Sequence, residues 1–410
     1  LGCLGAKARN LGMSATPPHG AIGRELKAHI LPSIDDVAAE DWDACVQGGH
    51  PFTRHAFLSA LEKSGSATAD TGWLSQQVVL KDKESSILGA VPMYLKNHSH
   101  GEYVFDHGWA DAFDRAGGRY YPKMQVSVPF TPATGPRLLL RADAWDSEEE
   151  KNALSGALLS ACIQRCEQVG ASSLHITFPN EAQAQLMSDA GFLLRSGMQF
   201  HWQNDGYDDF DGFLDSLASR KRKQIRRERR DALAEGLSVQ ALSGNEIEER
   251  HWDAFFHFYQ KTSSRKWGVP YLTREFFSLL SQNMGEQVVL IMVENNSQLI
   301  AGALNLKSDD TLYGRNWGSI EFHKFLHFEV CYYQAIDHAL THGLTRVEAG
   351  AQGEHKLVRG YLPCPTYSAH WIANESFRDA IGDYLERETQ QVDWEIESLG
   401  KHSPFRKNED

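Results

Sequence analysis

The feature that most constrains the fold is a faint internal repeat. The segment "DWDACVQGGHPFTRHAFLSALEKSG" at residues 41–65 is echoed by "HWDAFFHFYQKTSSRKWGVPYLTREFFSLLSQNMG" at residues 251–285. Both contain Trp-Asp-Ala, then an arginine shortly before a Phe-containing pattern of helical periodicity. At 410 residues the chain is also long for one domain, and two domains of about 150–200 residues are the prior expectation. The repeat therefore predicts two similar domains in tandem.

The echo continues through the rest of each copy. In both copies a Val-rich strand, a polar turn and a strand through Gly-Ala predict a β-hairpin, at residues 76–96 and 286–307. Aromatic segments predicted as strands follow, "EYVFDHGW" at 102–109 and "TLYGRNWG" at 311–318. Each copy then has a long helical pattern that ends near a glycine and leads into a short strand. This order predicts an α+β fold, in which each domain is a mixed, mostly antiparallel sheet flanked by helices.

Composition excludes several classes of protein. The net charge of -13 and the sequence pI of about 5.8 argue against a general DNA-binding protein. We find no apolar run of about 18 residues, so no membrane span is expected. The six cysteines show neither a CxxC pair nor a regular disulfide framework. This pattern predicts reduced thiols and a cytoplasmic protein.

Residues 1–27 are expected to be a disordered or leader segment outside the fold. They carry no initiator Met at the first position and no acidic residue before Glu25. They are either upstream translation ahead of Met13 or the remnant of a transit peptide. The second alternative would place the protein in an organellar stroma or matrix.

The most charged stretch, "SRKRKQIRRERRD", carries eight basic residues and one acid over residues 220–230. It belongs to a pattern without Gly or Pro from residue 213 to 235, which predicts one continuous helix. At about 100° per residue, Lys221 and Glu228 fall on the same side as the apolar Ile225. One charged face of this helix is therefore expected to point toward the rest of the protein.

This basic helix has three alternative interpretations. It is a solvated helix paired with acidic neighbours, a contact for a phosphate-bearing partner, or an RNA-binding element. Arginine favours the second, because its guanidinium pairs bidentately with phosphate. We expect Lys221, Arg222 and Arg226 to edge a cleft between the two domains, and Arg229 and Arg230 to be solvated.

The densest chemistry lies in the second copy, in "VEAGAQGEHKLVRGY" at residues 347–361. A strand end followed by a Gly-containing loop is where α/β proteins tend to place their sites. Carboxylate and imidazole groups there are candidate general bases for deprotonating an amine, and cationic groups can hold a phosphate or an oxyanion. The candidate catalytic residues are Glu348, His355 and Lys356, and the candidate binding residues of this segment are Gly350, Gly353 and Arg359.

Other reaction classes lack their sequence signatures. No GxSxG nucleophile elbow, no Walker GxxxxGK[ST] loop and no glycine fingerprint after a strand is present. Nucleotide hydrolysis and dinucleotide redox chemistry are therefore disfavoured. His323 and His327 are four residues apart without a third ligand, so no metal site is expected.

From about Leu31 to Lys407 the chain resembles the FemAB-like family of the GNAT acyl-CoA N-acyltransferase superfamily. The segments that carry this resemblance include "HPFTRHAFLSALEKSG", "SRKRKQIRRERR", "FLHFEVCYYQAIDHALTHGLTRVEAGAQGEHKLVRGYLPCPTYSAHWI" and the closing "HSPFRK". The resemblance implies two tandem GNAT-like domains. We place them at 28–205 and 206–400, the second beginning with the basic helix, and treat 401–410 as a tail.

The resemblance also implies roles for particular residues. Fem-type ligases carry a pattern like R-x-N-I-R, which Arg222, Gln224, Ile225 and Arg226 match here, so these arginines are candidate phosphate contacts. The ligases also carry F-K-K-G-F, which this chain matches as "LVRGY". Arg359 and Tyr361 are thereby candidate substrate-binding residues, and Val358 stands where the ligases have a lysine.

The implied function is transfer of an acyl or aminoacyl group to an amine, on a cell-wall precursor or another phosphorylated substrate. Acyl-CoA or aminoacyl-tRNA is the candidate co-substrate, and no tightly bound cofactor is expected. The partners would be a phosphorylated small molecule or glycan and, for an aminoacyl donor, tRNA. The alternative from another class is a non-catalytic binding protein for a phosphorylated glycan or nucleotide. RNA binding through the basic helix is a further alternative.

Overall fold

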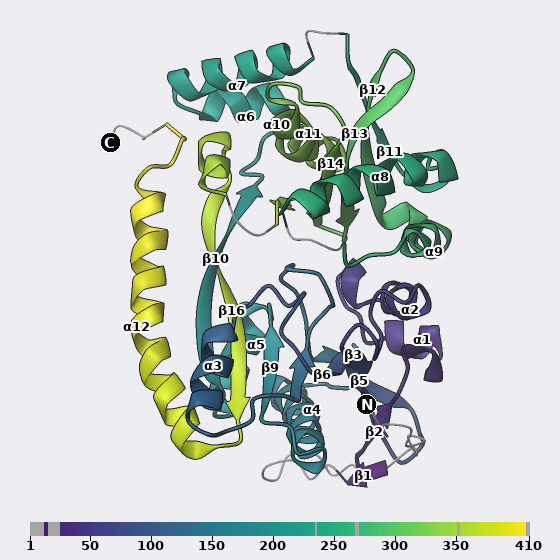
Figure 1. Cartoon of the computed structure of the whole chain (residues 1–410), viewed down its shortest axis with the longest axis vertical. Helices are drawn as coiled ribbons and strands as arrows, with labels where there is room; N and C mark the ends of the chain where they lie inside the picture. Colours follow the sequence, from purple (N-terminus) through teal and green to yellow (C-terminus); the bar gives the residue numbers. More distant parts are fainter. Residues whose placement is uncertain (1–11, 15–24, 234–235, 267–269, 351–352, 407–410) are drawn as a thin grey trace. The chain divides into compact units, whose positions relative to one another are not determined.

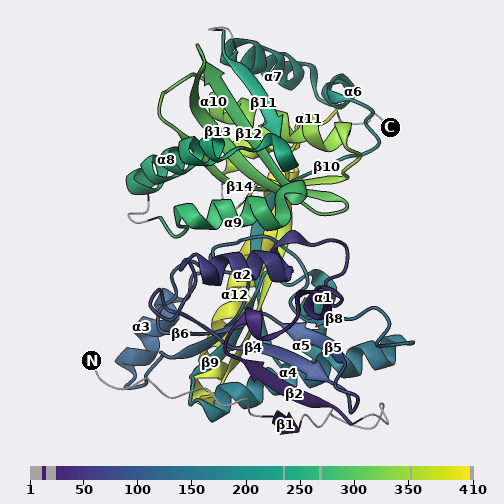
Figure 2. The same cartoon turned by 90° about the vertical axis from the view of Figure 1, so that its right-hand side faces the viewer.

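The computed structural model shows two compact units, each described here by itself (Figure 1 and Figure 2). Unit 1 comprises Leu1–Ser196 and Tyr367–Glu388, and unit 2 comprises Gly197–Thr366 and Thr389–Asp410. These bounds differ from the contiguous division that we placed at residues 205/206, because the chain returns to unit 1 late in the sequence. The residues that the structure describes are 12–14, 25–233, 236–266, 270–350 and 353–406.

Unit 1 contains two sheets. Their strands are β1 (Gly12–Ser14), β2 (Lys27–Leu31), β3 (Trp73–Ser75), β4 (Gln77–Lys81), β5 (Ile87–Val91), β6 (Met93–Lys96), β7 (Lys123–Val126), β8 (Leu139–Leu140), β9 (Ser173–Thr177) and part of β16 (Leu362–Ile372). One sheet has the antiparallel order β1-β2-β4-β5-β8, and the other runs β3-β6-β7-β9-β16 with β7 parallel to β9. Because β4 pairs antiparallel with β5, the hairpin predicted at 76–96 is confirmed.

The core of unit 1 forms around the helix α4 (Glu148–Gln168). The Ser147 hydroxyl caps the helix by accepting a hydrogen bond from the Glu150 N–H at 3.2 Å. After α4, Gly170 adopts a left-handed φ of 65°, as predicted for a helix end. Leu158 and Cys162 of α4 pack in the cluster that also buries the apolar face of the sheets. The other helices are α1 (Ala39–Asp43), α2 (His55–Lys63), α3 (His107–Arg115), α5 (Glu181–Asp189) and the first half of α12 (Glu375–Gly400).

Unit 2 is built around one sheet. Its strands are β10 (Leu193–Gln203), β11 (Ser238–Leu242), β12 (Val288–Asn295), β13 (Gln298–Lys307), β14 (Thr311–Ser319) and β15 (Arg346–Glu348). They follow the order β11-β12-β13-β14-β15-β10, with β14 parallel to β15 and the other pairs antiparallel. The hairpin predicted at 286–307 and the strand at 311–318 are thus confirmed. The helices include α6 (Phe210–Ser216), α7 (Ser219–Ala232), α8 (Glu249–Lys266), α9 (Arg274–Met284) and α11 (Gln334–Thr341).

Each unit is completed by a strand from the other half of the sequence. In unit 2, residues 201–203 of β10 pair with β15, although β10 follows the first copy of the repeat. In unit 1, residues 368–372 of β16 pair with β9, although β16 follows the second copy. This exchange explains why the units are not contiguous along the chain.

The strand predicted at "EYVFDHGW" is wrong. Residues 102–106 form an irregular segment, and α3 begins at His107. Tyr103 has a left-handed φ of 61°, which a strand does not allow. The physical reason is electrostatic, since Glu102 and Asp106 turn inward to pair with Lys123. The strand that pairs with β6 is β7 instead.

The single helix predicted over 213–235 is also wrong, because it breaks into α6 and α7. Leu217 and Ala218 between them are extended, with ψ values of 153° and 139°. Leu217 is buried and forms a bridge with Phe405, and the Ala218 N–H donates to the Pro404 carbonyl at 2.9 Å. Pairing with the C-terminal segment therefore overrides the local helix propensity. α7 ends at Ala232, and residues 234–235 lie outside the described residues.

Candidate functional site

The candidate site in unit 2 starts at the carboxyl end of β15. Parallel pairing of β14 with β15 sets Glu348 opposite Tyr313, with the Glu348 side chain 2% exposed. Arg346 Nε lies 3.6 Å from Glu348 Oε1, and His201 Nε2 lies 3.9 Å from Oε2. Burial, together with Arg346 and Lys356, lowers the pKa of His201 to about 3, so this imidazole is neutral at pH 7.

Two glycines flank the loop that follows the strand. Gly350 and Gly353 both have a left-handed φ, at 74° and 116°, which explains glycine at these positions. A side chain at Gly353 would also meet the His355 ring at 2.5 Å. The loop between these two candidate binding residues includes residues 351–352, which lie outside the described residues.

Lys356 places a cation against the carbonyl of Gly350, at the start of this loop. Its Nζ donates to the Gly350 carbonyl at 2.7 Å, and the residue is 2% exposed. Its ammonium contacts no carboxylate among the residues that the structure describes. Burial lowers the pKa of Lys356 to about 8, so most of this side chain is an ammonium at neutral pH. A buried ammonium of this kind is suited to stabilise negative charge that develops on a substrate.

The 3₁₀ helix Glu354–Arg359 carries the other predicted groups. His355 is exposed, and its Nε2 lies 2.8 Å from the Tyr332 hydroxyl. Arg359 is 3% exposed, donates to the His355 carbonyl at 2.6 Å, and its guanidinium lies 3.5 Å from the Phe328 ring centroid. Tyr361 is fully buried, and its hydroxyl donates to the Tyr332 carbonyl at 3.1 Å. The turn thus presents His355 outward and holds Arg359 inside.

Glu228 joins the basic helix to this turn, a role that we did not predict. Its carboxylate accepts hydrogen bonds from Gln224 Nε2 at 2.9 Å, the Tyr333 hydroxyl at 2.5 Å and Arg359 Nη2 at 2.8 Å. The helical wheel already placed Glu228 on the inward side of α7, and that signal pointed to it. A buried carboxylate on that side needs a cationic partner, which Arg359 supplies.

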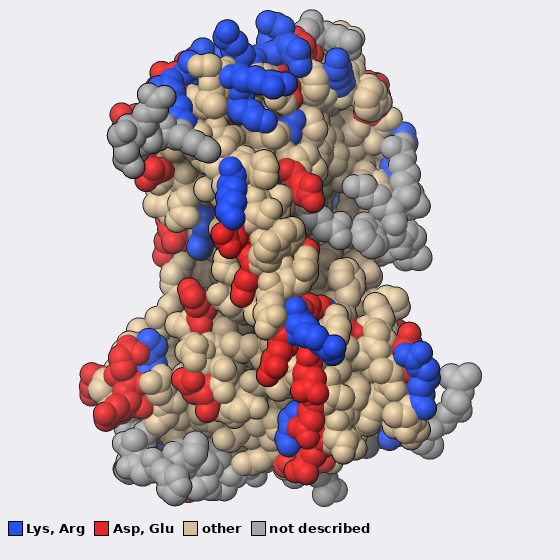
Figure 3. Space-filling model, turned by 90° about the vertical axis from the view of Figure 1, so that its left-hand side faces the viewer, with Lys and Arg blue, Asp and Glu red and all other residues tan. Residues whose placement is uncertain are grey.

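Lys221, Arg222 and Arg226 lie on α7, and within the part of the chain that the structure describes none of them forms a hydrogen bond or ion pair with the 354–359 turn. Arg222 Nη1 pairs with Asp215 at 3.0 Å, and Arg226 Nη2 pairs with Asp211 at 3.0 Å, both on α6. Lys221 is half-buried. Figure 3 shows the basic side chains gathered over α7. The structure therefore joins α7 to the turn through Glu228, and not through the predicted arginines.

The expectation that Arg229 is solvated is wrong. Its side chain is 23% exposed and pairs with Glu329 at 3.0 Å and Asp337 at 2.5 Å. Its guanidinium also lies 4.2 Å from the Phe210 ring centroid. Glu329 and Asp337 lie on the helix that follows β14, and buried Glu329 needs a cation to offset its charge. Arg230 is solvated as expected, at 72% exposed.

A π-helical turn brings these partners inward. The helix predicted after β14 consists of α10 (Leu326–Phe328), a π-helix over Glu329–Tyr333, and α11. The wider turn buries Glu329 and Tyr333, which face Arg229 and Glu228. Single π-turns inside helices occur frequently at functional sites. This turn also contacts the 354–359 turn, because the hydroxyl of its Tyr332 lies 2.8 Å from His355 Nε2.

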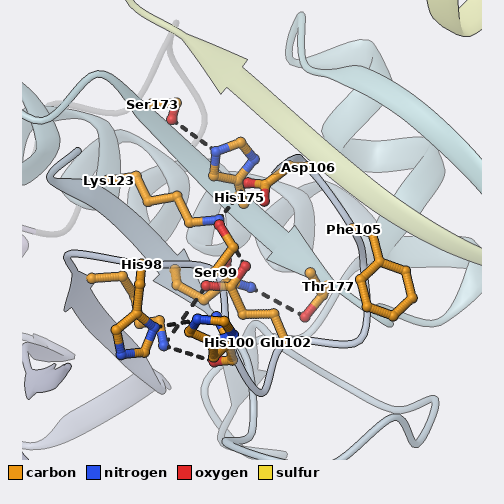
Figure 4. Close-up of polar contacts among 12 residues, drawn as sticks. His98, Ser99, His100, Glu102, Phe105, Asp106, Lys123, Ser173, His175 and Thr177 are labelled. Carbon is orange, nitrogen blue, oxygen red and sulfur yellow. Dashed lines mark hydrogen bonds and ion pairs between the residues drawn. The ribbon is translucent and has the colours of Figure 1, made fainter. Parts of the chain in front are cut away.

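Unit 1 contains a separate cluster of buried polar groups (Figure 4). Lys123 pairs with Glu102 at 2.7 Å and with Asp106, and the Tyr120 hydroxyl donates to Asp106 at 2.7 Å. Lys96 lies 3.8 Å from Glu102, and its ammonium is 3.3 Å from the Trp73 ring centroid. Two cations balance two carboxylates, so this cluster is electrostatically neutral.

Protonation in this cluster follows from burial and pairing. Burial lowers the pKa of Lys96 to about 7, despite the attraction of Glu102. Burial raises the pKa of Glu102 to about 7, partly offset by Lys123. Although burial alone would raise it, Lys123 lowers the pKa of Asp106 well below its usual range. These groups are sealed from solvent, and we interpret the cluster as part of the fold of unit 1.

The exchanged strands carry a matched pair of histidines. His201-Trp202 in β10 and His370-Trp371 in β16 are the same dipeptide in the two copies. His201 pairs in register with Glu348, and His370 pairs with His175, where the two Nδ1 atoms are 2.6 Å apart. His-Trp also occurs at residues 251–252 in α8, so the dipeptide alone does not identify these strands in the sequence.

The described residues contain neither a metal-binding cluster nor a membrane-spanning helix. No group of three or more His, Cys, Asp and Glu side chains in this part of the chain is arranged to hold a metal ion. Within the same residues, no helix is both long and apolar enough to cross a membrane.

Comparisons with known proteins give a family and a fold. The FemAB-like family model, described as peptidoglycan biosynthesis/recognition, matches residues 33–407. A comparison with curated protein sequences gives no match. A crystal structure of FemX is 14% identical, with a TM-score of 0.54 over 84% of this chain and 98% of that chain.

The C-terminal domain of a putative lysylphosphatidylglycerol synthetase from Agrobacterium fabrum is 8% identical, with a TM-score of 0.50 over 84% of this chain and 96% of that one. At such identities the similarity shows the fold alone. Together with the topology of the two units, it confirms the predicted α+β fold of two tandem GNAT-like domains.

Proposed function

The chain belongs to the FemAB-like family, and from this premise we propose that it transfers an acyl or aminoacyl group to an amine. The reaction takes place in unit 2, at the segment from Glu348 to Tyr361. The observation that carries this proposal is the Lys356 ammonium, which is 2% exposed and held at 2.7 Å by the Gly350 carbonyl. A cation fixed in this way is preorganised for an oxyanion, and it does not need to reorganise during the reaction.

The proposed reaction forms an amide bond and releases the leaving group of the donor. The amine nitrogen attacks the carbonyl carbon of the donor, which is an ester in aminoacyl-tRNA and a thioester in acyl-CoA. A C–N bond forms, and the carbonyl oxygen becomes an oxyanion beside Lys356. The C–O or C–S bond between the carbonyl carbon and the leaving group then breaks, and the leaving oxygen or sulfur is protonated. The products are an amide and a free tRNA 3′ end or CoA thiol.

His355 is the base that the geometry favours. It is exposed, whereas Glu348 is 2% exposed and lies beside Arg346. The Tyr332 hydroxyl, 2.8 Å from Nε2, orients the His355 ring. His355 therefore takes the amine proton, and Glu348 supports the strand end.

The substrates follow from the cationic groups and from the family. Arg222 and Arg226 of α7 bind a phosphate of the donor or acceptor by exchanging Asp215 and Asp211 for it. The carboxylates of both pairs are exposed, at 67% for Asp215 and 78% for Asp211, and surface pairs of this kind contribute only about 0.2–1 kcal/mol each, so a phosphate group competes well. The acceptor is an amine on a phosphorylated peptidoglycan precursor, in keeping with the description of the family.

Transfer is tested by product analysis with both donor classes. The protein is incubated with labelled aminoacyl-tRNA or acyl-CoA and a UDP-linked muropeptide that carries a free amine. Formation of the amide by mass spectrometry supports the proposal. A thermal shift with the muropeptide but no transfer from either donor would identify a non-catalytic binding protein instead.

A further inference from the structure

An aromatic groove in unit 1 has no part in the proposed transfer. It has a volume of about 730 Å³ and lies between α3 and the first half of α12. Figure 1 shows these two helices side by side. The groove shares no residue with the 348–361 segment, so its ligand is independent of the proposed transfer.

The sequence explains why the two helices leave a groove. Gly108, Ala112 and Ala116 recur every four residues on α3 and line the groove, opposite Ala380 of α12. Residues four apart lie on one face of a helix, so these small side chains form a continuous shallow stripe. Volume that larger side chains would occupy therefore stays open to solvent.

Aromatic rings form the walls. Trp109 is 6% exposed and packs against His370 at 4.8 Å between ring centroids, which fixes it as a rigid floor. Phe113 and Phe377 are stacked at 4.4 Å. Phe105 and Tyr384 are 56% and 42% exposed, and both line the groove. Exposed aromatic rings gathered at one concave place are typical of a binding site.

The charges around the groove favour an uncharged ligand. Arg195, the cation in the lining, is held bidentately by Glu388 at 2.7 Å for both bonds, and its Nη1 donates to the Phe105 carbonyl at 2.7 Å. A cationic ligand would meet this guanidinium. Among the described residues, the lining contains no carboxylate, and its charged side chain, Arg195, is already neutralised by Glu388, so the groove offers no unpaired charge to an anionic or cationic ligand. Figure 3 shows the acidic side chains of this unit on the outer surface of the molecule.

Polar groups at the rim add a second requirement. Asn374 and Ser376 also line the groove, as does Tyr384, whose hydroxyl donates to Glu388 at 2.9 Å. An uncharged ligand with one apolar face and several hydroxyl groups satisfies both surfaces. We propose that this groove binds a saccharide ring, with its C–H face on the aromatic side chains and its hydroxyl groups toward the rim.

The test uses chitotetraose, a soluble uncharged saccharide, with the full chain and isothermal titration calorimetry. We expect wild-type protein to bind it, and Tyr384→Ala to weaken binding about tenfold by removing one stacking ring. Ala112→Phe should block the groove and abolish binding. Trp394→Ala, which removes an aromatic ring that is 61% exposed elsewhere on α12, should leave the affinity unchanged.

Several results would overturn the proposal. Wild-type protein that does not bind chitotetraose contradicts it, as does binding that survives both Tyr384→Ala and Ala112→Phe. Self-association that Tyr384→Ala abolishes would show instead that a second copy occupies the groove. If Ala112→Phe fails to fold, Tyr384→Ala decides alone, because this side chain is 42% exposed and its removal leaves no buried cavity of comparable size. Lys356→Met should bind chitotetraose normally, which separates this inference from the proposed transfer.

Discussion

The Glu228 carboxylate accepts a hydrogen bond from Arg359 Nη2 at 2.8 Å, with both side chains less than 5% exposed. This bond ties the basic helix α7 to the turn that carries His355 and Lys356. Because Arg359 also donates to the His355 carbonyl at 2.6 Å, a shift of α7 is transmitted to the predicted base. Helix α7 is therefore coupled to the site through its buried acidic residue, Glu228.

Glu228→Gln is expected to lower the free energy of unfolding by about 3–5 kcal/mol, because it leaves the buried Arg359 without its counter-ion. Urea denaturation measures this change. Arg230→Gln is the matched control on the same helix, and its loss should stay below about 0.5 kcal/mol, because that side chain is 72% exposed. A loss below about 1 kcal/mol for Glu228→Gln would show that the pair does not hold the helix.

The Lys356 ammonium predicts an alkaline limit to transfer. Its pKa is lowered to about 8, so the cation that stabilises the oxyanion disappears as the pH rises through 8. We expect kcat/KM to fall tenfold per pH unit above that value. In Lys356→Met this fall of kcat/KM above pH 8 should be absent. The rate itself should be largely lost. A wild-type profile that stays flat from pH 7 to 9.5 would exclude this role.

Arg222→Ala combined with Arg226→Ala should raise KM for the phosphorylated substrate about tenfold or more, with little change in stability. The expectation follows because the ion pairs of these arginines with α6 are largely at the surface, while a phosphate contact gains a bidentate bond. Steady-state kinetics at 50 and 200 mM salt measure it. Arg230→Ala is the control, and equal KM values in all three proteins would leave these arginines without a role in binding.

Buried histidines predict acid sensitivity. Burial lowers the pKa of His175 and His201 to about 3, and that of His370 well below its usual 6.5. Below pH 6.5 the unfolded chain binds protons that the folded chain excludes, so stability is present above 6.5 and is lost as the pH falls. Each histidine contributes a slope of up to about 1.4 kcal/mol per pH unit.

Denaturation midpoints between pH 7.5 and 4.5 check this slope. His370→Gln should make the dependence shallower by about one proton, whereas His100→Gln, at an exposed position, should leave it unchanged. Equal stability at pH 7.5 and 5 would contradict the account of these buried imidazoles.

Sequence patterns predicted the parts of the fold that local periodicity specifies. The hairpin strands β4 and β5, and β12 and β13, follow from alternation and turn residues. The inward position of Glu228 follows from the helical wheel. Its partners could not be predicted, because Tyr333 and Arg359 lie 105 and 131 residues away along the chain. A buried carboxylate indicates that a partner is present, but the local sequence does not identify that partner.

The failures share a physical cause. Arg229 looked solvated because its partners, Glu329 and Asp337, are distant in sequence and depend on a π-helical turn. The segment 102–106 looked like a strand because its aromatic residues favour one, yet its acids turn inward to Lys123. In both cases long-range charge pairing overrides local propensity.

The central claim is that Lys356 stabilises acyl transfer to an amine in unit 2. Single-turnover assays with labelled donor and amine acceptor test it most directly, comparing wild type with Lys356→Met and with Arg230→Ala as control. We predict amide formation by wild type and Arg230→Ala, and a rate at least about 100-fold lower for Lys356→Met. Transfer by Lys356→Met at the wild-type rate would contradict the account.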